Sequence, residues 1–363
     1  GYDADELGEM VESLLINHLI EQTSIASNKF VRVYKVTSAG IAEIEKPTLG
    51  SKKIGGKYVF TPTSITENDR KLFLAFDFFL KKYNDEQKKA ITSAAKTILC
   101  IAGAGSGKTT TLTKRIEFLI RFRSVATEKI LAITFTRKAR QEMMHRLACA
   151  GVEGVRVETF NSFCEKILLA HNDLAYGRAV RVMSFGDKIR LMQQALNGRS
   201  IASCVDIYYS PAQQRGKEKE ELASGFMNDC FTIIEHYKCE GKKLDDFSLK
   251  KALSFDERRS AKLVYDICLQ IVMLMDKEGL RDYTDQLVDT IRLFNAHPEI
   301  VSRYSHVLVD EYQDINSLQE QLIDHLKPEN LFCVGDPRQS IFGWRGSHVK
   351  YILDFEKKYA GCE

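Results

Sequence analysis

The chain has 363 residues, of which 44% are hydrophobic and 28% charged, and its formal net charge is +3. This composition is ordinary for a soluble globular protein, and the length indicates two or three domains. The net charge is too close to zero to indicate nucleic-acid binding by itself, so any basic surface must be local.

The cysteines and the hydropathy pattern bear on the compartment. Nine cysteines occur singly, without C-x-x-C or zinc-ligand spacing, which favours reduced thiols. No apolar run reaches the roughly 18 residues that a membrane-spanning helix needs, and we find no signal-peptide pattern. We therefore expect a cytoplasmic protein with no membrane partner.

Residues 1–61 are predicted to form a small N-terminal module. Apolar residues between positions 7 and 19 recur at the spacing of an amphipathic helix, and residues 30–36 alternate in part like a strand. Residues 34–44 resemble the join between strand and last helix in winged-helix DNA-binding domains; a helical lead-in that packs on the next domain is the alternative. A helix beginning near Thr66 then opens the next domain.

From residue 84 onward, predicted strands and helices alternate. The first three strands cover residues 97–101, 129–135 and 155–159, and a helix follows each of them. Two further apolar segments, residues 306–309 and 331–334, continue the strand pattern. Such alternation predicts an α/β fold with a parallel sheet and helices on its faces.

Residues 171–295 interrupt this alternation. They are mostly helical in pattern, with a loop near residues 210–219 and a long helix around 256–278. We interpret them as an all-α insertion. The main domain then consists of residues 62–170 and 296–363.

A glycine-rich turn, Ala102–Thr109, lies between the first predicted strand and its helix. It departs from the strict P-loop pattern because Ala102 occupies the first glycine position; an ordinary glycine-rich turn is the alternative. Its glycines allow successive N–H groups to point into one concavity, to which the helix N-terminus adds positive charge. We expect a nucleoside triphosphate site in which Lys108 reaches the β- and γ-phosphates and Thr109 ligates Mg²⁺. The predicted nucleotide-binding residues here are Gly103, Ala104, Gly105, Ser106, Gly107, Lys108, Thr109 and Thr110.

An acidic pair, Asp310 and Glu311, directly follows the predicted strand at 306–309. Ligands of parallel sheets bind at the carboxyl ends of the strands. Asp310 is predicted to hold Mg²⁺, and Glu311 to accept a proton from the attacking water. A solvated acidic strand end is the alternative for this pair taken alone.

Six segments, in order along the chain, resemble the motifs of UvrD/Rep-type superfamily 1 DNA helicases. They are Tyr83–Gln87 (Q motif), Ala102–Thr109 (motif I), Ile133–Ala139 (motif Ia), Thr159–Phe163 (motif Ib), Leu308–Asp314 (motif II) and Gly335–Gly346 (motif III). The resemblance covers roughly residues 84–355, and it departs from the family at Asn161, where the family usually has His. It implies a RecA-like P-loop NTPase motor domain, called 1A, and identifies the helical insertion as domain 1B.

The resemblance also implies roles for single residues. Gln87 corresponds to the residue that reads the adenine edge, and Gln339 to the γ-phosphate sensor; Lys108 and Glu311 join Gln339 as catalytic residues. Arg345 is a further predicted nucleotide contact. The predicted DNA-binding residues are Thr134, Phe135, Thr136, Arg137, Thr159, Phe160, Phe342 and Trp344. On residue type alone, a helix-surface amide at Gln87 and a core residue at Trp344 are the alternatives.

The family implies an enzyme, an ATP- and Mg²⁺-dependent DNA helicase that moves 3′→5′ on single-stranded DNA or at a duplex–single-strand junction, with DNA repair among its expected roles. We find no counterpart of motif IV or of the second motor domain, which supplies arginine fingers. We therefore expect the N-terminal half of such an enzyme, with little activity alone. The alternative is a non-motor, nucleotide-dependent DNA-binding or regulatory protein that uses a half-site as a switch.

Overall fold

A computed structural model describes residues 63–103, 105–242, 244, 255–339 and 350–363, together with the backbone of two strands near the N-terminus. These strands, β1 (Ile20–Ile25) and β2 (Arg32–Val36), pair antiparallel. The rest of the N-terminal module, including the predicted helix at 7–19, lies outside the described residues. The winged-helix interpretation therefore stays a prediction.

The chain divides into two compact units. One comprises Gly1–Thr61, Met183–Ile234 and Lys243–Lys277, and the other Pro62–Val182, Glu235–Lys242 and Glu278–Glu363. The second unit contains a five-stranded sheet, and all the site residues discussed below belong to it.

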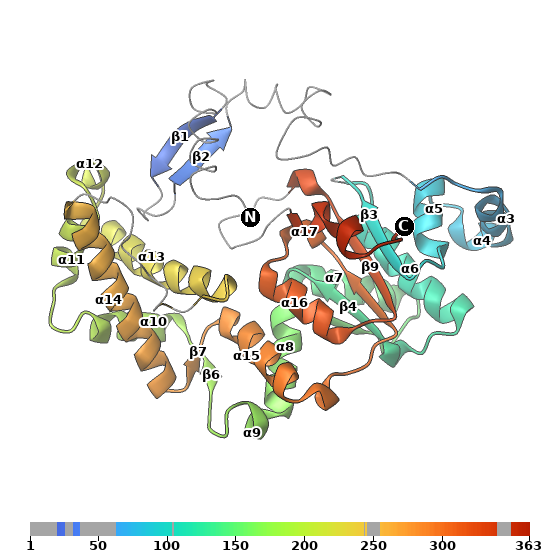
Figure 1. The fold of residues 1–363 in the computed structure, drawn as a ribbon. Helices are drawn as coiled ribbons and strands as arrows, with labels where there is room; N and C mark the ends of the chain where they lie inside the picture. Colours follow the sequence, from blue (N-terminus) through green and yellow to red (C-terminus); the bar gives the residue numbers. More distant parts are fainter. Residues whose placement is uncertain are drawn as a thin grey trace. The chain divides into compact units, whose positions relative to one another are not determined.

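The sheet is parallel throughout, with strand order β3-β9-β8-β4-β5; Figure 1 labels β3, β9 and β4. Its strands are β3 (Thr97–Ile101), β9 (Asn330–Gly335), β8 (His306–Val309), β4 (Ile130–Thr134) and β5 (Arg156–Thr159). All five residues of the interior strand β4 are buried, as expected where helices cover both faces of a sheet. The predicted α/β fold with a parallel sheet is confirmed.

Alternate strand residues enter two separate hydrophobic cores, because successive side chains of a strand point to opposite faces. Leu131, Val307 and Leu331 belong to the core that includes helices α8 (Phe160–Ala170), α15 (Tyr283–Ala296) and α16 (Ser317–Leu326). Their neighbours Ala132, Leu308 and Phe332 belong to the core that includes α6 (Lys108–Arg123) and α7 (Arg137–Cys149). The sheet is thus held between two helical layers.

Three short helices precede the sheet: α3 (Glu67–Ala75), α4 (Asp77–Leu80) and α5 (Asp85–Thr92). Thr66 caps α3 with a reciprocal pair of hydrogen bonds to Asp69, which confirms the predicted helix start. A small core of Phe73, Leu80, Ile91 and Phe118 joins these helices to α6.

The other unit is helical where its side chains are described, and α10 (Phe185–Ala195) and α11 (Ile201–Tyr208) pack against α14 (Phe255–Lys277). The predicted loop at 210–219 is partly wrong, because α12 (Pro211–Gln214) lies within it. Ser210 and Gln213 form a capping box and Pro211 occupies the first turn, which stabilises this short helix. Helix α13 (Lys219–Cys239) follows and continues into the sheet-containing unit.

The remaining elements are short. They are η1 (Thr127–Lys129), α9 (Asn172–Ala175), the parallel pair β6 (Arg181–Val182) and β7 (Leu280–Arg281), η3 (Pro298–Ile300), η4 (Tyr312–Asp314), η5 (Pro337–Gln339), α17 (Lys350–Leu353) and α18 (Phe355–Lys358). The β6–β7 pair lies within the segment predicted to be all-α. No helix in the described part of the chain is long and apolar enough to cross a membrane.

Candidate functional site

The turn between β3 and α6 has the geometry that a phosphate loop requires. The Ala102 N–H donates to the Gly335 carbonyl at the end of the adjacent strand β9 (3.0 Å), and the Ser106 hydroxyl donates to the Gly103 carbonyl (2.6 Å). Gly105 and Gly107 have φ of +72° and +84°, in the left-handed region that favours glycine. The predicted context of strand, turn and helix is confirmed; Ala104 lies outside the described residues.

The end of β8 brings a carboxylate to the first turn of α6. The Thr109 hydroxyl donates to Asp310 Oδ2 at 3.1 Å. Burial, followed by the charge of Glu311, raises the pKa of Asp310 to about 6. A hydroxyl and a buried carboxylate side by side are oxygen ligands of the kind that Mg²⁺ prefers, so these two predicted metal ligands fit the ion.

Lys108 and Glu311 form an ion pair, with 2.9 Å between Nζ and Oε2. Apart from this ion pair, the buried Lys108 Nζ atom has no hydrogen-bond partner among the described residues, so donors remain that suit a phosphate. Glu311 has φ of +50°, a strained conformation for a residue with a side chain and one that is common at functional sites. Gln313 Nε2 donates to Glu311 Oε2 at 2.9 Å.

Gln313 joins this pair to the end of β9. Its Oε1 accepts from the Asp336 N–H at 2.9 Å, and Asp336 Oδ2 accepts from Gln339 Nε2 at 2.5 Å. The predicted catalytic residues Glu311 and Gln339 are therefore connected through Gln313 and Asp336, two residues for which the sequence predicted no individual role. Their positions in the sequence offered one clue: Gln313 follows β8 and Asp336 follows β9, and these two strands end at the same edge of the sheet.

The side chain of Gln87 is held at both ends. Its Oε1 accepts from the Asn84 N–H at 3.1 Å as part of a capping box, and its Nε2 donates to the Ser106 carbonyl at 2.9 Å. The structure thus places Gln87 against the phosphate loop. Thr110, one residue beyond the predicted metal ligand Thr109, accepts a hydrogen bond from Arg146 of α7 at 2.6 Å.

The predicted DNA-binding residues of motif Ia lie at the end of β4. Thr136 caps α7 and is exposed, as is Arg137, while Phe135 is half-buried. Thr134 is buried, and its hydroxyl donates to the Thr136 carbonyl at 3.3 Å. Thr136 and Arg137 are thus the exposed side chains among the four predicted DNA contacts of motif Ia.

The motif Ib residues lie at the end of β5. Thr159 caps α8, and Phe160 is buried in the core beneath it. Asn161, which replaces the usual family His, donates through Nδ2 to the Tyr283 carbonyl (2.6 Å) and to Gln286 Oε1 (3.2 Å). This side chain ties α8 to α15. Phe342, Trp344 and Arg345 lie outside the described residues.

A glycine-rich loop that opens a helix, with an acidic pair at the end of a nearby parallel strand, defines the P-loop NTPase class. A family model described as "UvrD/REP helicase N-terminal domain" matches residues 83–360. The chain belongs to this family.

Named relatives agree with this assignment. The chain is 31% identical over 294 residues to a "Probable DNA helicase II homolog" of Rickettsia felis, 33% over 302 residues to "ATP-dependent DNA helicase UvrD1" of Mycobacterium tuberculosis, and 31% over 290 residues to "ATP-dependent DNA helicase PcrA" of Bacillus subtilis. These matches cover 78%, 78% and 77% of the chain, but only 41%, 36% and 36% of the respective relatives. The chain thus spans about two fifths of the length of these relatives.

Proposed function

We propose that this chain is the ATP-binding and single-strand-binding N-terminal half of a 3′→5′ DNA helicase. The observation that carries the proposal is the pairing of Lys108 with Glu311 and of Thr109 with Asp310 at one edge of the sheet. The names of the relatives support ATP as the nucleotide and DNA as the substrate. Residues 62–170 and 296–363 would form domain 1A, and residues 171–295 domain 1B.

In this proposal the phosphate loop binds the triphosphate through its backbone N–H groups, and Thr109 and Asp310 hold Mg²⁺. The ion, when bound, neutralises charge on the phosphates. Lys108 donates to the β- and γ-phosphates, which releases Glu311 from its ion pair. Glu311 can then accept a proton from water, and Gln339 can donate to the γ-phosphate. Gln87 and Arg345 are proposed as further nucleotide contacts.

The proposed DNA-binding face begins at the carboxyl ends of β4 and β5. Thr136 and Arg137 offer a hydroxyl and a cation suited to phosphate, which gives binding without sequence preference. Phe342 and Trp344 are proposed to stack on bases, as aromatic side chains do in single-strand-binding proteins. Of the remaining predicted contacts, Phe135 is half-buried and stays a proposed contact, whereas Thr134, Thr159 and Phe160 are buried and are proposed to hold the strand ends in place.

Titration of a fluorescent ATP analogue with Mg²⁺ tests the nucleotide site. Lys108→Ala removes the cation of the phosphate loop that is predicted to reach the β- and γ-phosphates, so we expect loss of measurable binding. Lys71→Ala is the matched control, since Lys71 is an exposed lysine of α3. Equal binding by both variants would contradict the proposal.

A further inference from the structure

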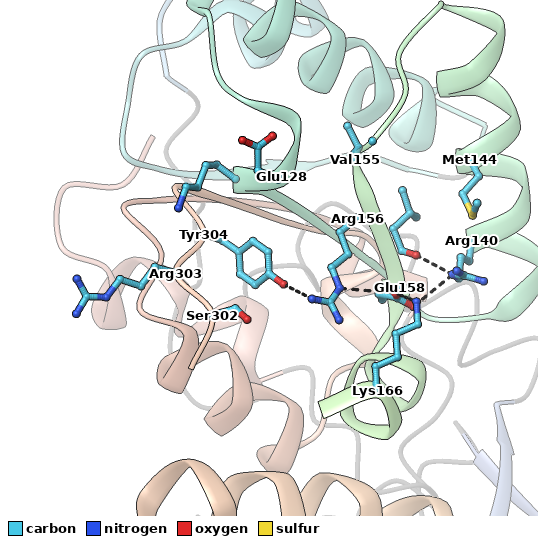
Figure 2. A pocket seen from close by; sticks show the side chains of 13 residues that line it. Glu128, Arg140, Met144, Val155, Arg156, Glu158, Lys166, Ser302, Arg303 and Tyr304 are labelled. Atoms are coloured by element: carbon cyan, nitrogen blue, oxygen red, sulfur yellow. Dashed lines mark hydrogen bonds and ion pairs between the residues drawn. The ribbon is translucent and has the colours of Figure 1, made fainter. Parts of the chain in front are cut away.

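A second candidate site lies at the opposite edge of the sheet from the phosphate loop. The loop follows β3, whereas this cavity of about 610 Å³ lies along the other edge strand, β5 (Figure 2). It extends from β5 to the segments that precede β4 and β8 and to helices α7 and α8.

The cavity is strongly basic. Its lining carries five cationic side chains, Lys129, Arg140, Arg156, Lys166 and Arg303, and two carboxylates, Glu128 and Glu158. The formal charge of the lining is therefore +3, which equals the net charge of the entire chain. Such a local concentration of positive charge attracts anions.

Glu158 fixes the position of three of these cations. Its carboxylate is 1% exposed and lies 3.5 Å from Arg140 Nε and 3.8 Å from Arg156 Nε, and it also pairs with Lys166. Arg156 lies between Glu158 and Tyr304, whose hydroxyl accepts from the Arg156 guanidinium at 2.8 Å (Figure 2). One carboxylate cannot neutralise three cations, so an ordered excess of positive charge remains.

Two further cations are free to receive a ligand. Lys129 and Arg303 are exposed, and no ion pair joins either of them to another residue that lines the cavity. An anion at this site would thus meet two exposed cations beside the ion-paired set around Glu158.

The lining also restricts the kind of anion. Arg140 Nε donates to the Val157 carbonyl of the edge strand at 2.7 Å. This carbonyl is therefore already hydrogen-bonded, whereas a peptide that extended the sheet would pair with the main-chain groups of the edge strand. Tyr304, the sole aromatic lining residue, is 5% exposed and offers no platform for base stacking. Phosphate groups of a strand, contacted without their bases, fit this chemistry.

We propose that this basic cavity binds backbone phosphates of a DNA strand that continues beyond the motif Ia and Ib residues; the inference rests on the proposed binding of single-stranded DNA. Lys129 precedes β4 and the motif Ia residues follow it, so the two sites lie at opposite ends of this strand. Residues of α7 and α8 link them. Arg140 belongs to the helix that begins at Arg137, and Ser162, which donates to Glu158 Oε2 at 2.7 Å, also forms the cap of α8 with Thr159.

The test uses fluorescence anisotropy with oligo-dT of increasing length. A double variant, Lys129→Gln with Arg303→Gln, removes the two cations that form no ion pair within the lining. It leaves Glu158 and its partners Arg140, Arg156 and Lys166 unchanged. Lys71→Gln with Lys82→Gln is the control, with the same change of charge at exposed positions outside the cavity. The parent chain and the control should bind long oligo-dT more tightly than short oligo-dT. We expect the Lys129→Gln, Arg303→Gln variant (the cavity variant) to lose this gain in affinity. The slope of its log affinity against log salt concentration should fall by about 0.7 for each phosphate that the variant no longer binds.

The outcomes separate the two proposals. If the parent chain binds no oligonucleotide of any length, proposed DNA binding and the cavity site both fail. If short and long oligonucleotides bind and the cavity variant matches the control, only the cavity site fails. Inorganic phosphate, added at matched ionic strength, would assign the cavity to free phosphate if it abolished the gain in affinity of long oligonucleotides. Poly-glutamate would assign the cavity to acidic peptides if it displaced the labelled oligonucleotide as effectively as unlabelled oligo-dT does. Either result would overturn the DNA assignment.

Discussion

Lys108 Nζ lies 2.9 Å from Glu311 Oε2, so the two side chains neutralise each other's charge. Lys108 is predicted to bind phosphate and Glu311 to activate water. A bound triphosphate would compete with Glu311 for the same ammonium. In the proposed mechanism, opening of this ion pair would be part of the free energy of nucleotide binding and would release the Glu311 carboxylate from Lys108.

Glu311→Gln should separate binding from turnover. The amide cannot pair ionically with Lys108 or accept a proton from water, so we expect ATP affinity equal to or above that of the parent chain and no measurable hydrolysis. Titration calorimetry and a coupled ATPase assay with oligo-dT give the two quantities. Residual turnover at the parent rate would exclude Glu311 as the base.

Asp310→Asn should stabilise the fold at neutral pH. Because burial raises the pKa of Asp310 to about 6, the folded chain holds this proton more tightly than the unfolded chain does. The contribution of Asp310 to the free energy of unfolding therefore falls as pH rises from about 4 to about 6. At about 1.4 kcal/mol per pKa unit, the variant should gain about 2–3 kcal/mol at pH 7 and little near pH 4. Urea unfolding of both proteins across this range measures the difference, and a constant difference would contradict it.

Gly335→Ala should disturb the packing of Gln313, which follows β8, against the end of β9. A Cβ at this position would lie 2.7 Å from Gln313 Oε1 and 3.1 Å from the Gln313 backbone N, so we expect a loss of about 1–3 kcal/mol in the free energy of unfolding. Gly186→Ala, where the nearest atom outside the neighbouring residues is 3.7 Å away, is the matched control. Equal thermal stability of the two variants would refute the prediction.

The strands, the flanking helices and the phosphate loop could be predicted because each depends on a local pattern. Continuous apolar runs indicate buried parallel strands, and the turn from Gly103 to Lys108 carries its own backbone requirements. The link from Gln313 to Asp336 could not be predicted, because it joins residues brought together only by strand order. The same holds for the contact of Gln87 with Ser106, and for the cation cluster around Glu158, whose members come from separate elements.

Trp344→Ala should weaken single-strand binding. Trp344 is the only tryptophan of the chain, and a stacked base contributes about 1–3 kcal/mol. We expect the affinity for oligo-dT to fall by that amount, and the tryptophan fluorescence of the parent chain to be quenched on binding. If oligo-dT binds without quenching and the variant binds equally well, Trp344 does not stack on DNA.

Gln87→Ala should weaken both ATP and GTP binding, with the larger loss for ATP. The variant removes the hydrogen bond to the Ser106 carbonyl and so loosens the phosphate loop, which any nucleoside triphosphate needs. It also removes the proposed contact with the adenine edge, which only ATP can make. Lys88→Ala on the same helix is the control, because the Lys88 side chain takes no part in the hydrogen bond between Gln87 and Ser106. Titration of both nucleotides gives the ratio of the two losses. A ratio of one would mean that Gln87 acts through the loop alone, and unchanged affinities for both nucleotides would remove it from the site.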